Sequence, residues 1–401
     1  MNTQQIAHSI VQRLVDAGHV AYFAGGWVRD HLLNLPSSDI DIATSASPDQ
    51  VAALFTKTIP VGIAFGSVVV VEDSHQFEVT TFRTEGPYLD GRHPSSVAPG
   101  SAEEDAKRRS FTVNGMFYDP LNNQVIDFVE GQADLAAGII RAIGNPDERF
   151  AEDKLRMIRA VRFAVRYDFQ IEPATAAAIH THAHELLPAV AVERIWQELQ
   201  KMTGHPKCGL FLAELHRHHL LEQIYPELEG VSQEEIELRL APLAHYPPNS
   251  PTIAYLTALF PHPTEAIGLR LKASRSQLQF LERQQELSRL LKEGTAQQLV
   301  HFYALDDAPL LLEIESASRD DRDTFLAHHR AEQNRLAQHI ERKRTGRPLV
   351  NSDHLKRTGV APGPQMGELL REAERIAIEE DLDDPEAVIT RLPLPPSSPP
   401  K

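Results

Sequence analysis

The stretch Ala24-Gly25-Gly26-Trp27-Val28-Arg29-Asp30, followed by Asp39-Ile40-Asp41, predicts a strand, a glycine turn, a short helix at residues 28–33 and a second strand. A glycine pair lets the backbone approach a ligand closely and turn its N–H groups toward phosphate. Strand side chains alternate with period two, so Asp39 and Asp41 present both carboxylates on one face. Paired carboxylates bind Mg²⁺, which prefers hard oxygen ligands and phosphate partners. The stretch therefore indicates phosphoryl or nucleotidyl transfer.

The composition is that of an ordinary soluble protein with two to four domains. The chain has 401 residues, of which 42% are hydrophobic and 24% are charged. It contains no apolar run long enough to span a membrane, so we expect no membrane partner. The single cysteine, Cys208, excludes an intrachain disulfide framework and favours a reducing compartment. We therefore expect a cytoplasmic protein.

The charge balance limits how the protein could bind nucleic acid. The formal net charge of −16 argues against a general electrostatic attraction, and no DNA partner is expected. An RNA partner would have to use local basic patches and a shaped surface. Three candidate patches are Lys107-Arg108-Arg109, the series Arg156, Arg159, Arg162 and Arg166, and Arg342-Lys343-Arg344.

The pattern of elements predicts an α+β protein. Short apolar segments predict strands at residues 20–24, 40–44, 67–72, 77–82, 112–119 and 125–128. No convincing strand follows residue 128, and the chain from about residue 153 onward is expected to be helical. A mixed β-sheet head with helices is thus followed by an all-α remainder. The last residues, 391–401, are proline-rich and are expected to be disordered.

The carboxylates have more than one interpretation when each motif is taken alone. An isolated Asp-x-Asp is more often a capping or turn feature than a metal site. The glycine pair and Arg29 upstream favour the metal interpretation, because arginine offers a planar donor fork for phosphate oxygens. Glu78 lies between apolar strand residues, and it either completes a metal-binding trio or is simply an exposed strand residue.

Taken in order, these residues resemble the class II template-independent nucleotidyltransferases, that is, the bacterial tRNA nucleotidyltransferases (CCA-adding enzymes) and their poly(A) polymerase relatives. The resemblance rests on five segments: residues 25–41, Arg108-Arg109-Ser110-Phe111-Thr112-Val113-Asn114, Glu152-Asp153-x-x-Arg156, Val192-Glu193-Arg194 and residues 359–368. It implies that Asp39 and Asp41 are catalytic and bind Mg²⁺, with Glu78 as a third ligand. It further implies that tRNA, CTP and ATP are the partners.

The resemblance also implies a division of labour along the chain. A nucleotidyltransferase head at residues 1–145 would carry the chemistry, and a helical neck at 146–205 would select the base. A helical body at 206–335 and a helical tail at 336–390 would dock RNA. The nucleotide would be bound by Gly25, Gly26, Arg29, Arg108, Arg109, Asp153, Arg156, Arg159 and Arg162.

The chemistry of base selection can be argued from Asp153 and Arg156. On a helix, residues three apart lie on one face, so the two side chains can present to a base together. Asp153 offers an acceptor and Arg156 offers donors, which match cytosine and adenine but oppose uracil and guanine. Each unmatched buried polar group costs about 1–3 kcal/mol, enough for strong discrimination. Without the resemblance, an ordinary helix salt bridge would be the favoured interpretation.

One residue departs from the family pattern, and two alternative functions remain open. Ser110 stands where the family usually has aspartate, and a serine hydroxyl cannot carry that negative charge. The closest alternative is a poly(A) polymerase, or a partial enzyme that adds only CC or only the terminal A. The alternative from another class is a noncatalytic RNA-binding protein on a decayed transferase scaffold.

Overall fold

The computed structural model describes residues 2–62, 66–88 and 94–394. It divides into two compact units. The N-terminal unit comprises residues 1–202 and 210–236, and the C-terminal unit comprises residues 203–209 and 237–401. The four-part division into head, neck, body and tail is finer than this and stays a prediction.

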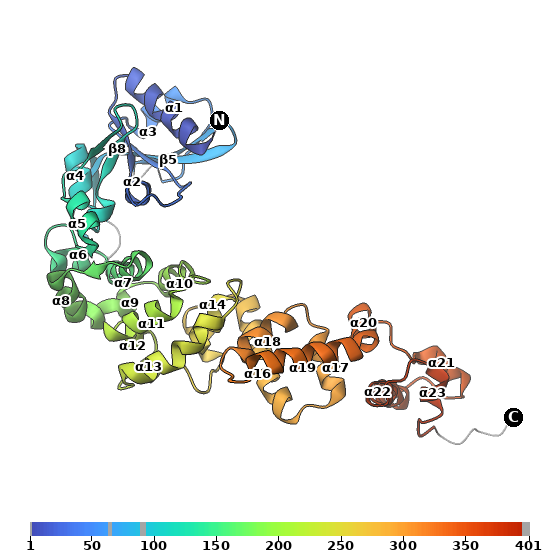
Figure 1. The fold of residues 1–401 in the computed structure, drawn as a ribbon. Coiled ribbons are helices and arrows are strands. Elements are labelled where there is room, and N and C mark those ends of the chain that lie inside the picture. Colours follow the sequence, from blue (N-terminus) through green and yellow to red (C-terminus); the bar gives the residue numbers. More distant parts are fainter. Residues whose placement is uncertain (1, 63–65, 89–93, 395–401) are drawn as a thin grey trace. The chain divides into compact units, whose positions relative to one another are not determined.

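A seven-stranded mixed sheet forms the framework of the N-terminal unit (Figure 1). Its strands, in spatial order, are β3 (Thr58–Ile59), β4 (Ser67–Glu72), β5 (His75–Thr81), β2 (Asp41–Thr44), β1 (Ala21–Ala24), β8 (Phe117–Asp119) and β9 (Gln124–Ile126). Only β2 and β5 pair in parallel, and all the other neighbours are antiparallel. The predicted α+β class is confirmed.

The two faces of this sheet differ because strand side chains alternate. Phe23, Ile42 and Val79 are paired across β1, β2 and β5, and all three are almost fully buried. Helices α1 (Thr3–Asp16) and α3 (Pro48–Leu54) pack against these strands. The residues just before Ile42 and Val79, Asp41 and Glu78, point to the opposite face. The sequence alternation thus commits one face to the core and leaves the other for polar groups.

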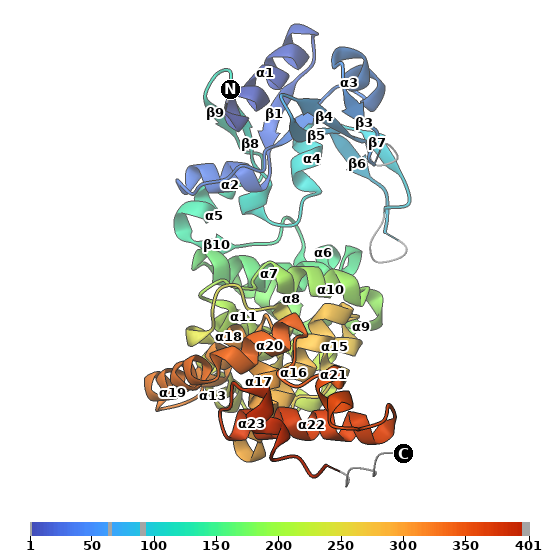
Figure 2. The same ribbon diagram turned by 90° about the vertical axis from the view of Figure 1, so that its right-hand side faces the viewer.

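The N-terminal unit also contains several helices (Figure 2), of which α7 and α10 are in contact. The helices are α2 (Gly26–Leu32), α4 (Ala102–Lys107), α5 (Gly131–Ala137), α6 (Pro146–Glu152), α7 (Leu155–Tyr167), α8 (Pro173–His182), α9 (Leu186–Ala189), α10 (Val192–Gln200), α12 (Leu221–Ile224) and most of α11 (Cys208–Arg217). α13 (Gln233–Leu240) begins in this unit.

Two strand predictions were wrong in detail. β11 (Gln170–Ile171) pairs in parallel with β10 (Ile139–Ile140), although no strand was expected after residue 128. A ladder of two residues is too short to show periodicity, so its signal was absent from the sequence. Thr112–Asn114, expected to be part of a strand, forms a 3₁₀ turn before β8. A separate hairpin pairs β6 (Arg83–Glu85) with β7 (Val97–Pro99).

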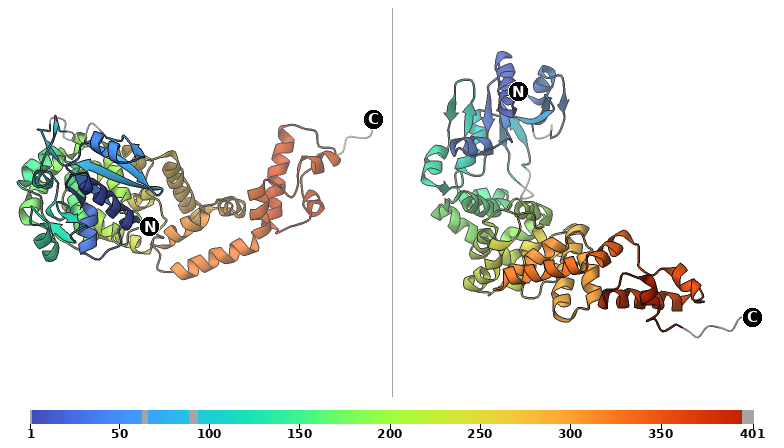
Figure 3. Two further views of the ribbon diagram at one scale, coloured as in Figure 1. Left: turned by 90° about the horizontal axis from the view of Figure 1, so that it is seen from above. Right: turned by 45° about the vertical axis from the view of Figure 1, so that its right-hand side comes forward.

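The C-terminal unit contains helices and no strand within its described residues (Figure 3). They are α14 (Thr252–Thr257), α15 (Ala266–Arg270), α16 (Arg275–Glu293), α17 (Ala296–Tyr303), α18 (Ala308–Ser316), α19 (Arg322–Arg335), α20 (Ala337–Thr345), α21 (Ser352–Arg357), α22 (Pro364–Glu379) and α23 (Pro385–Ile389). None of the helices seen in the chain is both long and apolar enough to cross a membrane. Residues 395–401 of the proline-rich end lie outside the described residues.

Candidate active site

A cavity of about 500 Å³ opens on the polar face of the sheet in the N-terminal unit. Ala24 and Asp41 are paired across β1 and β2, so the glycine turn and the aspartate reach the same edge. The cavity is lined by most of the residues predicted to bind nucleotide or metal, namely Gly25, Gly26, Arg29, Asp41, Glu78, Arg108, Arg109, Asp153, Arg156 and Arg159. Asp39 and Arg162 are not among its lining residues.

The carboxylates gather at the sheet wall of the cavity. β2 and β5 run in parallel with Ile42 opposite Val79, which sets Asp41 beside Glu78 one residue earlier on each strand. Desolvation, reinforced by repulsion from Asp39 and Glu78, raises the pKa of Asp41 to about 6, although Arg109 opposes the shift. Asp39 therefore lies near enough to Asp41 to repel it, just before β2 begins. Crowded carboxylates of this kind attract a cation.

Gly25 is the one glycine here whose conformation is required. Its φ of +67° lies in the left-handed region, and a Cβ at this position would sit 3.1 Å from Nη1 of Arg109. Its N–H donates to the carbonyl of Met116 at 3.3 Å, which ties the turn to the segment before β8. Glycine thus leaves the space in which a ligand can meet the backbone and Arg109 together.

The basic pair after α4 is held by acidic partners that sequence analysis missed. Asp105, almost fully buried, accepts from Arg108 Nε at 2.8 Å and from Arg109 Nη2 at 2.9 Å. Burial alone would raise the pKa of Asp105, but the two guanidinium groups outweigh it and lower that pKa. Glu85 accepts from Arg108 Nη1 at 3.0 Å. The spacing of Asp105 from the pair on α4 was the available signal.

The Arg29 side chain is buried and already has several partners within the protein. It is 5% exposed, and its Nε and Nη2 donate to Asp30 at 2.9 and 2.7 Å. Its guanidinium also donates to Asn114 and lies 4.3 Å from the centre of the Tyr167 ring. The Tyr167 hydroxyl donates to Asp30 at 3.0 Å. Arg29 lines the cavity and at the same time ties α2 to α7.

The expected geometry of Asp153 and Arg156 was wrong, although both line the cavity. α6 ends at Glu152 and α7 begins at Leu155, so Asp153 occupies an extended break and not a helix face. There it accepts the Leu155 N–H at 3.1 Å, as capping aspartates do. Arg194 on α10 donates two hydrogen bonds to the Asp153 carboxylate, with lengths of 3.1 and 2.7 Å. The sequence spacing could not reveal a break that this cap creates.

Arg156 is fixed by its own set of partners. It donates to the Arg149 carbonyl at 3.1 Å and also binds the Glu152 carboxylate. Arg149 in turn donates to the carbonyl of Arg108 at 3.1 Å, which links α6 to the basic pair. The two side chains predicted to select the base are thus held on separate scaffolds, one from α10 and one from α6.

Arg159 and Arg162 have different surroundings despite their common helix. Arg159 lines the cavity, and its Nε is buried with no hydrogen-bond partner among the described residues. Arg162 instead donates to Glu198 of α10 at 2.6 Å, and the two side chains are 7% and 5% exposed. Arg162 therefore braces α7 against α10, while Arg159 faces the cavity with an unused donor. Ser110 also lines the cavity, directly after the basic pair.

No group of three or more His, Cys, Asp or Glu side chains arranged to hold a metal ion is found within the described residues. The chemistry of the donor set nevertheless fits a hard divalent cation, because Asp39, Asp41 and Glu78 supply only carboxylate oxygens.

Comparisons with known proteins show which families the chain resembles. The family model described as "Poly A polymerase head domain" matches residues 21–141, and the one described as "Probable RNA and SrmB- binding site of polymerase A" matches residues 168–231. A protein of Streptococcus pyogenes serotype M3 named CCA-adding enzyme is 36% identical over 389 residues, which are 95% of this chain and 94% of that protein.

Solved structures extend the likeness over the whole chain. The structure of the Bacillus stearothermophilus CCA-adding enzyme in complex with CTP matches with a TM-score of 0.80 and 30% identity, covering 98% of each chain. The Thermotoga maritima CCA-adding enzyme complexed with tRNA shares the fold at a TM-score of 0.69 and 19% identity, over 96% of this chain and 94% of that one. The chain therefore belongs to the family of class II CCA-adding enzymes and poly(A) polymerases.

Proposed function

We propose that the protein is a CCA tRNA nucleotidyltransferase, which adds C, C and A from CTP and ATP to the 3′ end of tRNA and releases pyrophosphate. The observation that carries this proposal is that a single cavity brings together two chemistries. Asp41 and Glu78 supply carboxylates for a metal, which would in turn bind the reacting phosphate. Asp153 and Arg156 supply an acceptor and donors for a base. Full-length relatives named CCA-adding enzyme support the same activity.

Membership of the family implies a divalent metal, and we assign Mg²⁺ to it. Asp39 and Asp41 would hold the ion, with Glu78 as a further oxygen ligand and the incoming triphosphate completing the site. When bound, the ion would activate the RNA 3′-hydroxyl and neutralise charge on the α-phosphate. The 3′-hydroxyl oxygen loses its proton and attacks the α-phosphorus in line. The bond between the α-phosphorus and the oxygen that bridges it to the β-phosphate breaks, and pyrophosphate leaves.

The triphosphate would lie against the glycine turn and the basic pair. Gly25 and Gly26 would offer backbone N–H groups, and Arg108 and Arg109 would neutralise the phosphate oxygens. Arg29 would contribute a remaining N–H and keep α2 in register with α7. The unpartnered Nε of Arg159 gives a further donor, which a phosphate or a base can satisfy.

Base selection would depend on rigidity as well as on hydrogen-bonding pattern. Cytosine and adenine both present an exocyclic amine beside a ring-nitrogen acceptor, which suits the Asp153 carboxylate and the Arg156 guanidinium. Because Arg194 fixes the carboxylate, Asp153 cannot turn away when a uracil carbonyl faces it. Arg162 would act as a positioning residue through Glu198. It would not contact the nucleotide.

The experiment that tests the function uses tRNAs that end before the tail, after one C, and after CC. Each is incubated with the protein, Mg²⁺ and every NTP singly and in pairs, and the products are resolved by length. A CCA-adding enzyme gives one C, two C or a terminal A according to the starting end. It does so with CTP and ATP and not with UTP or GTP.

The same product ladder separates the alternatives. A poly(A) polymerase would extend generic RNA with ATP alone and ignore CTP, and a partial enzyme would stop at CC or start only after it. RNA binding without any incorporation would favour a noncatalytic protein, but Asp41, Asp153 and Arg156 are all present in the cavity. A cytoplasmic location is part of the proposal, since tRNA is processed there and the buried Cys208 suits a reducing compartment.

A further inference from the structure

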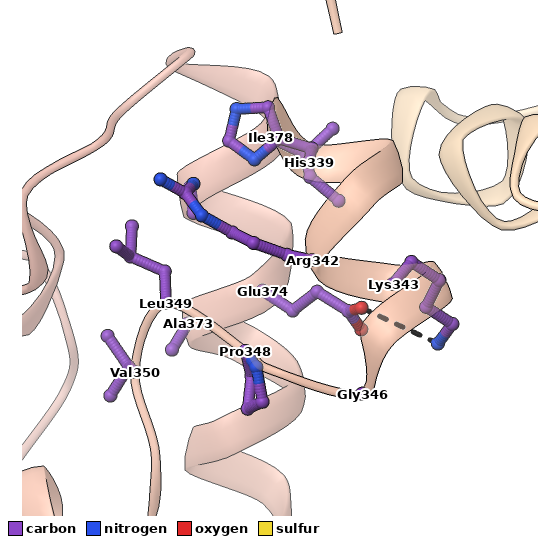
Figure 4. Close-up of a pocket in the computed structure, with 11 residues that line it drawn as sticks. His339, Arg342, Lys343, Gly346, Pro348, Leu349, Val350, Ala373, Glu374 and Ile378 are labelled. Atoms are coloured by element: carbon purple, nitrogen blue, oxygen red, sulfur yellow. Dashed lines mark ion pairs between the residues drawn. The ribbon is translucent and has the colours of Figure 1, made fainter. Parts of the chain in front are cut away.

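A second pocket lies within the C-terminal unit, between α20, α22 and the segment 346–350 that follows α20 (Figure 4). Its volume is about 130 Å³, and both helices that border it pack on α17. Much of its wall is apolar, formed by Leu349, Val350, Ala373, Ala377 and Ile378. Because an apolar cavity of about 150 Å³ can hold benzene, this pocket has room for a ligand of about six heavy atoms.

Arg342 is the polar group that this pocket leaves unsatisfied. Its side chain extends from α20 across the pocket, and its Nη1 is buried with no hydrogen-bond partner among the described residues. Its Nη2 donates only to the neutral Gln338, at 3.3 Å. Figure 4 marks an ion pair for Lys343 and none for Arg342. A buried donor without an acceptor is unfavourable, and a ligand that accepts from it removes that penalty.

The carboxylates near the pocket already have basic partners. Glu374 of α22 is paired with His301 of α17 at 3.1 Å and with Lys343 of α20 at 3.5 Å. Asp381, just after α22, is paired with His339 of α20 at 3.2 Å. These pairs connect the helices around the pocket, and they leave the guanidinium inside it without a negative partner from the side chains that line the same wall.

We propose that this pocket binds a small aliphatic monocarboxylate. Its carboxylate would accept from Nη1 of Arg342 and balance the charge of the guanidinium, while its hydrocarbon chain would pack on the apolar wall. A phosphate group fits less well, because its several strong acceptors would meet one spare donor and an apolar surface. The site belongs to the C-terminal unit and takes no part in the proposed nucleotide transfer.

The test titrates the full-length protein with sodium valerate, whose short chain suits the volume of the pocket. Saturation-transfer difference NMR should give a dissociation constant on the order of 1 mM, as expected for so small a ligand. Valeramide has the same shape without the charge, and it should bind about 10-fold more weakly. Inorganic phosphate at the same concentration should not displace valerate.

Two variants assign the binding to this pocket. Arg342→Gln removes the charge, so it should weaken valerate binding about 10-fold, leave valeramide binding unchanged, and thereby abolish the preference for the anion. Ala373→Leu fills the pocket and should abolish the binding of both compounds. Arg371→Gln, at an exposed position on the same α22, is the matched control and should behave as the wild type. Thermal melts followed by far-UV circular dichroism check that each variant folds.

The preference for the anion decides the outcome even if Ala373→Leu fails to fold, because unchanged valeramide binding shows that the pocket of Arg342→Gln is intact. A preference that is present in the wild type and absent from Arg342→Gln supports the inference. The inference is overturned if the wild type binds no valerate up to about 10 mM, or if it binds valerate and valeramide equally. Displacement by phosphate, or a preference that persists in Arg342→Gln, overturns it as well.

Discussion

The two walls of the cavity differ in whether their charged side chains are paired with opposite charges from the protein. On the sheet wall, Asp41 stands among like charges, and its carboxyl pKa is raised to about 6. On the helical wall, Asp153 is gripped by Arg194, and Arg162 is paired with Glu198. The first arrangement leaves negative charge unbalanced, whereas the second pairs Asp153 and Arg162 with opposite charges from α10.

This difference corresponds to two kinds of task. Charge that must be neutralised by a metal arriving with its nucleotide cannot be neutralised in advance by the protein. Charge that must discriminate between bases has to be immobile, because a side chain that can rotate would accept either hydrogen-bonding pattern. The comparison predicts that substitutions on the sheet wall abolish chemistry, and that substitutions on the helical wall reduce stability and selectivity.

The largest effect is expected from removing the carboxylates of the sheet wall. Replacing both Asp39 and Asp41 by alanine should lower nucleotide incorporation at least about 1,000-fold, the equivalent of about 4 kcal/mol, because no ligand would then place a metal at the α-phosphate. Single-turnover incorporation of CTP measures this loss. Asp49→Ala, an exposed aspartate on α3, is the control. Substantial activity in the double variant would refute the metal assignment.

The next effect concerns the ion pair that braces α7 against α10. Arg162→Met leaves Glu198 buried, with Lys201 at 2.7 Å as its remaining partner, and should lower the free energy of unfolding by about 3 kcal/mol. Urea denaturation followed by fluorescence is suitable, because both tryptophans, Trp27 and Trp196, lie in the N-terminal unit.

The control for this second prediction is an ion pair on the surface. Lys107→Met breaks the exposed pair with Glu103 and should change the free energy of unfolding by no more than about 0.5 kcal/mol. Adding Glu198→Leu to Arg162→Met should restore much of the loss, since a buried pair can be replaced by apolar groups. Equal effects of the buried and exposed substitutions would remove the contrast between the walls.

Selectivity should respond to the residue that holds Asp153. Arg194→Ala frees the carboxylate to rotate, so discrimination between CTP and UTP should fall about 10- to 100-fold. The ratio of kcat/KM for the two nucleotides measures it, and Arg166→Ala, an exposed arginine on α7, serves as the control. An unchanged ratio with a lower kcat for both would mean that Arg194 matters for stability alone.

The smallest effect is on the stability of the metal-free protein. The folded protein disfavours the charged form of Asp41, because its pKa of about 6 exceeds the ordinary value of 3.8. The destabilisation is absent below about pH 4, where the carboxyl group is neutral in both states, and is complete above pH 6. Asp41→Asn should therefore raise the free energy of unfolding at pH 7.5 by about 1 kcal/mol after allowance for solvent screening. Urea denaturation at pH 4 should show no difference, and a stabilisation that persists there would point to another cause.

Several parts of the site could be predicted from the sequence because they are local. The glycine turn and Asp41 belong to one short motif, and Ala24, which precedes the turn, pairs with Asp41 across β1 and β2. Glu78 was left open between a metal ligand and an exposed strand residue. Strand pairing with β2 sets it on the cavity wall, where it is exposed, and its role as a metal ligand stays a prediction. The partners of the basic pair were missed, because Glu85 reaches Arg108 from a different hairpin. The roles of these site residues in nucleotide binding stay predictions.

By itself, the sequence determined the α+β class and the alternation that turns Asp41 toward the polar face of the sheet. Local propensity and period-two spacing are enough for both, since each depends on neighbours along the chain. Only the tertiary structure decided that Asp153 lies in a break before α7, and that Arg159 faces the cavity while Arg162 does not. These outcomes depend on contacts with Arg194 and Glu198, which lie far along the chain, and no local spacing encodes them.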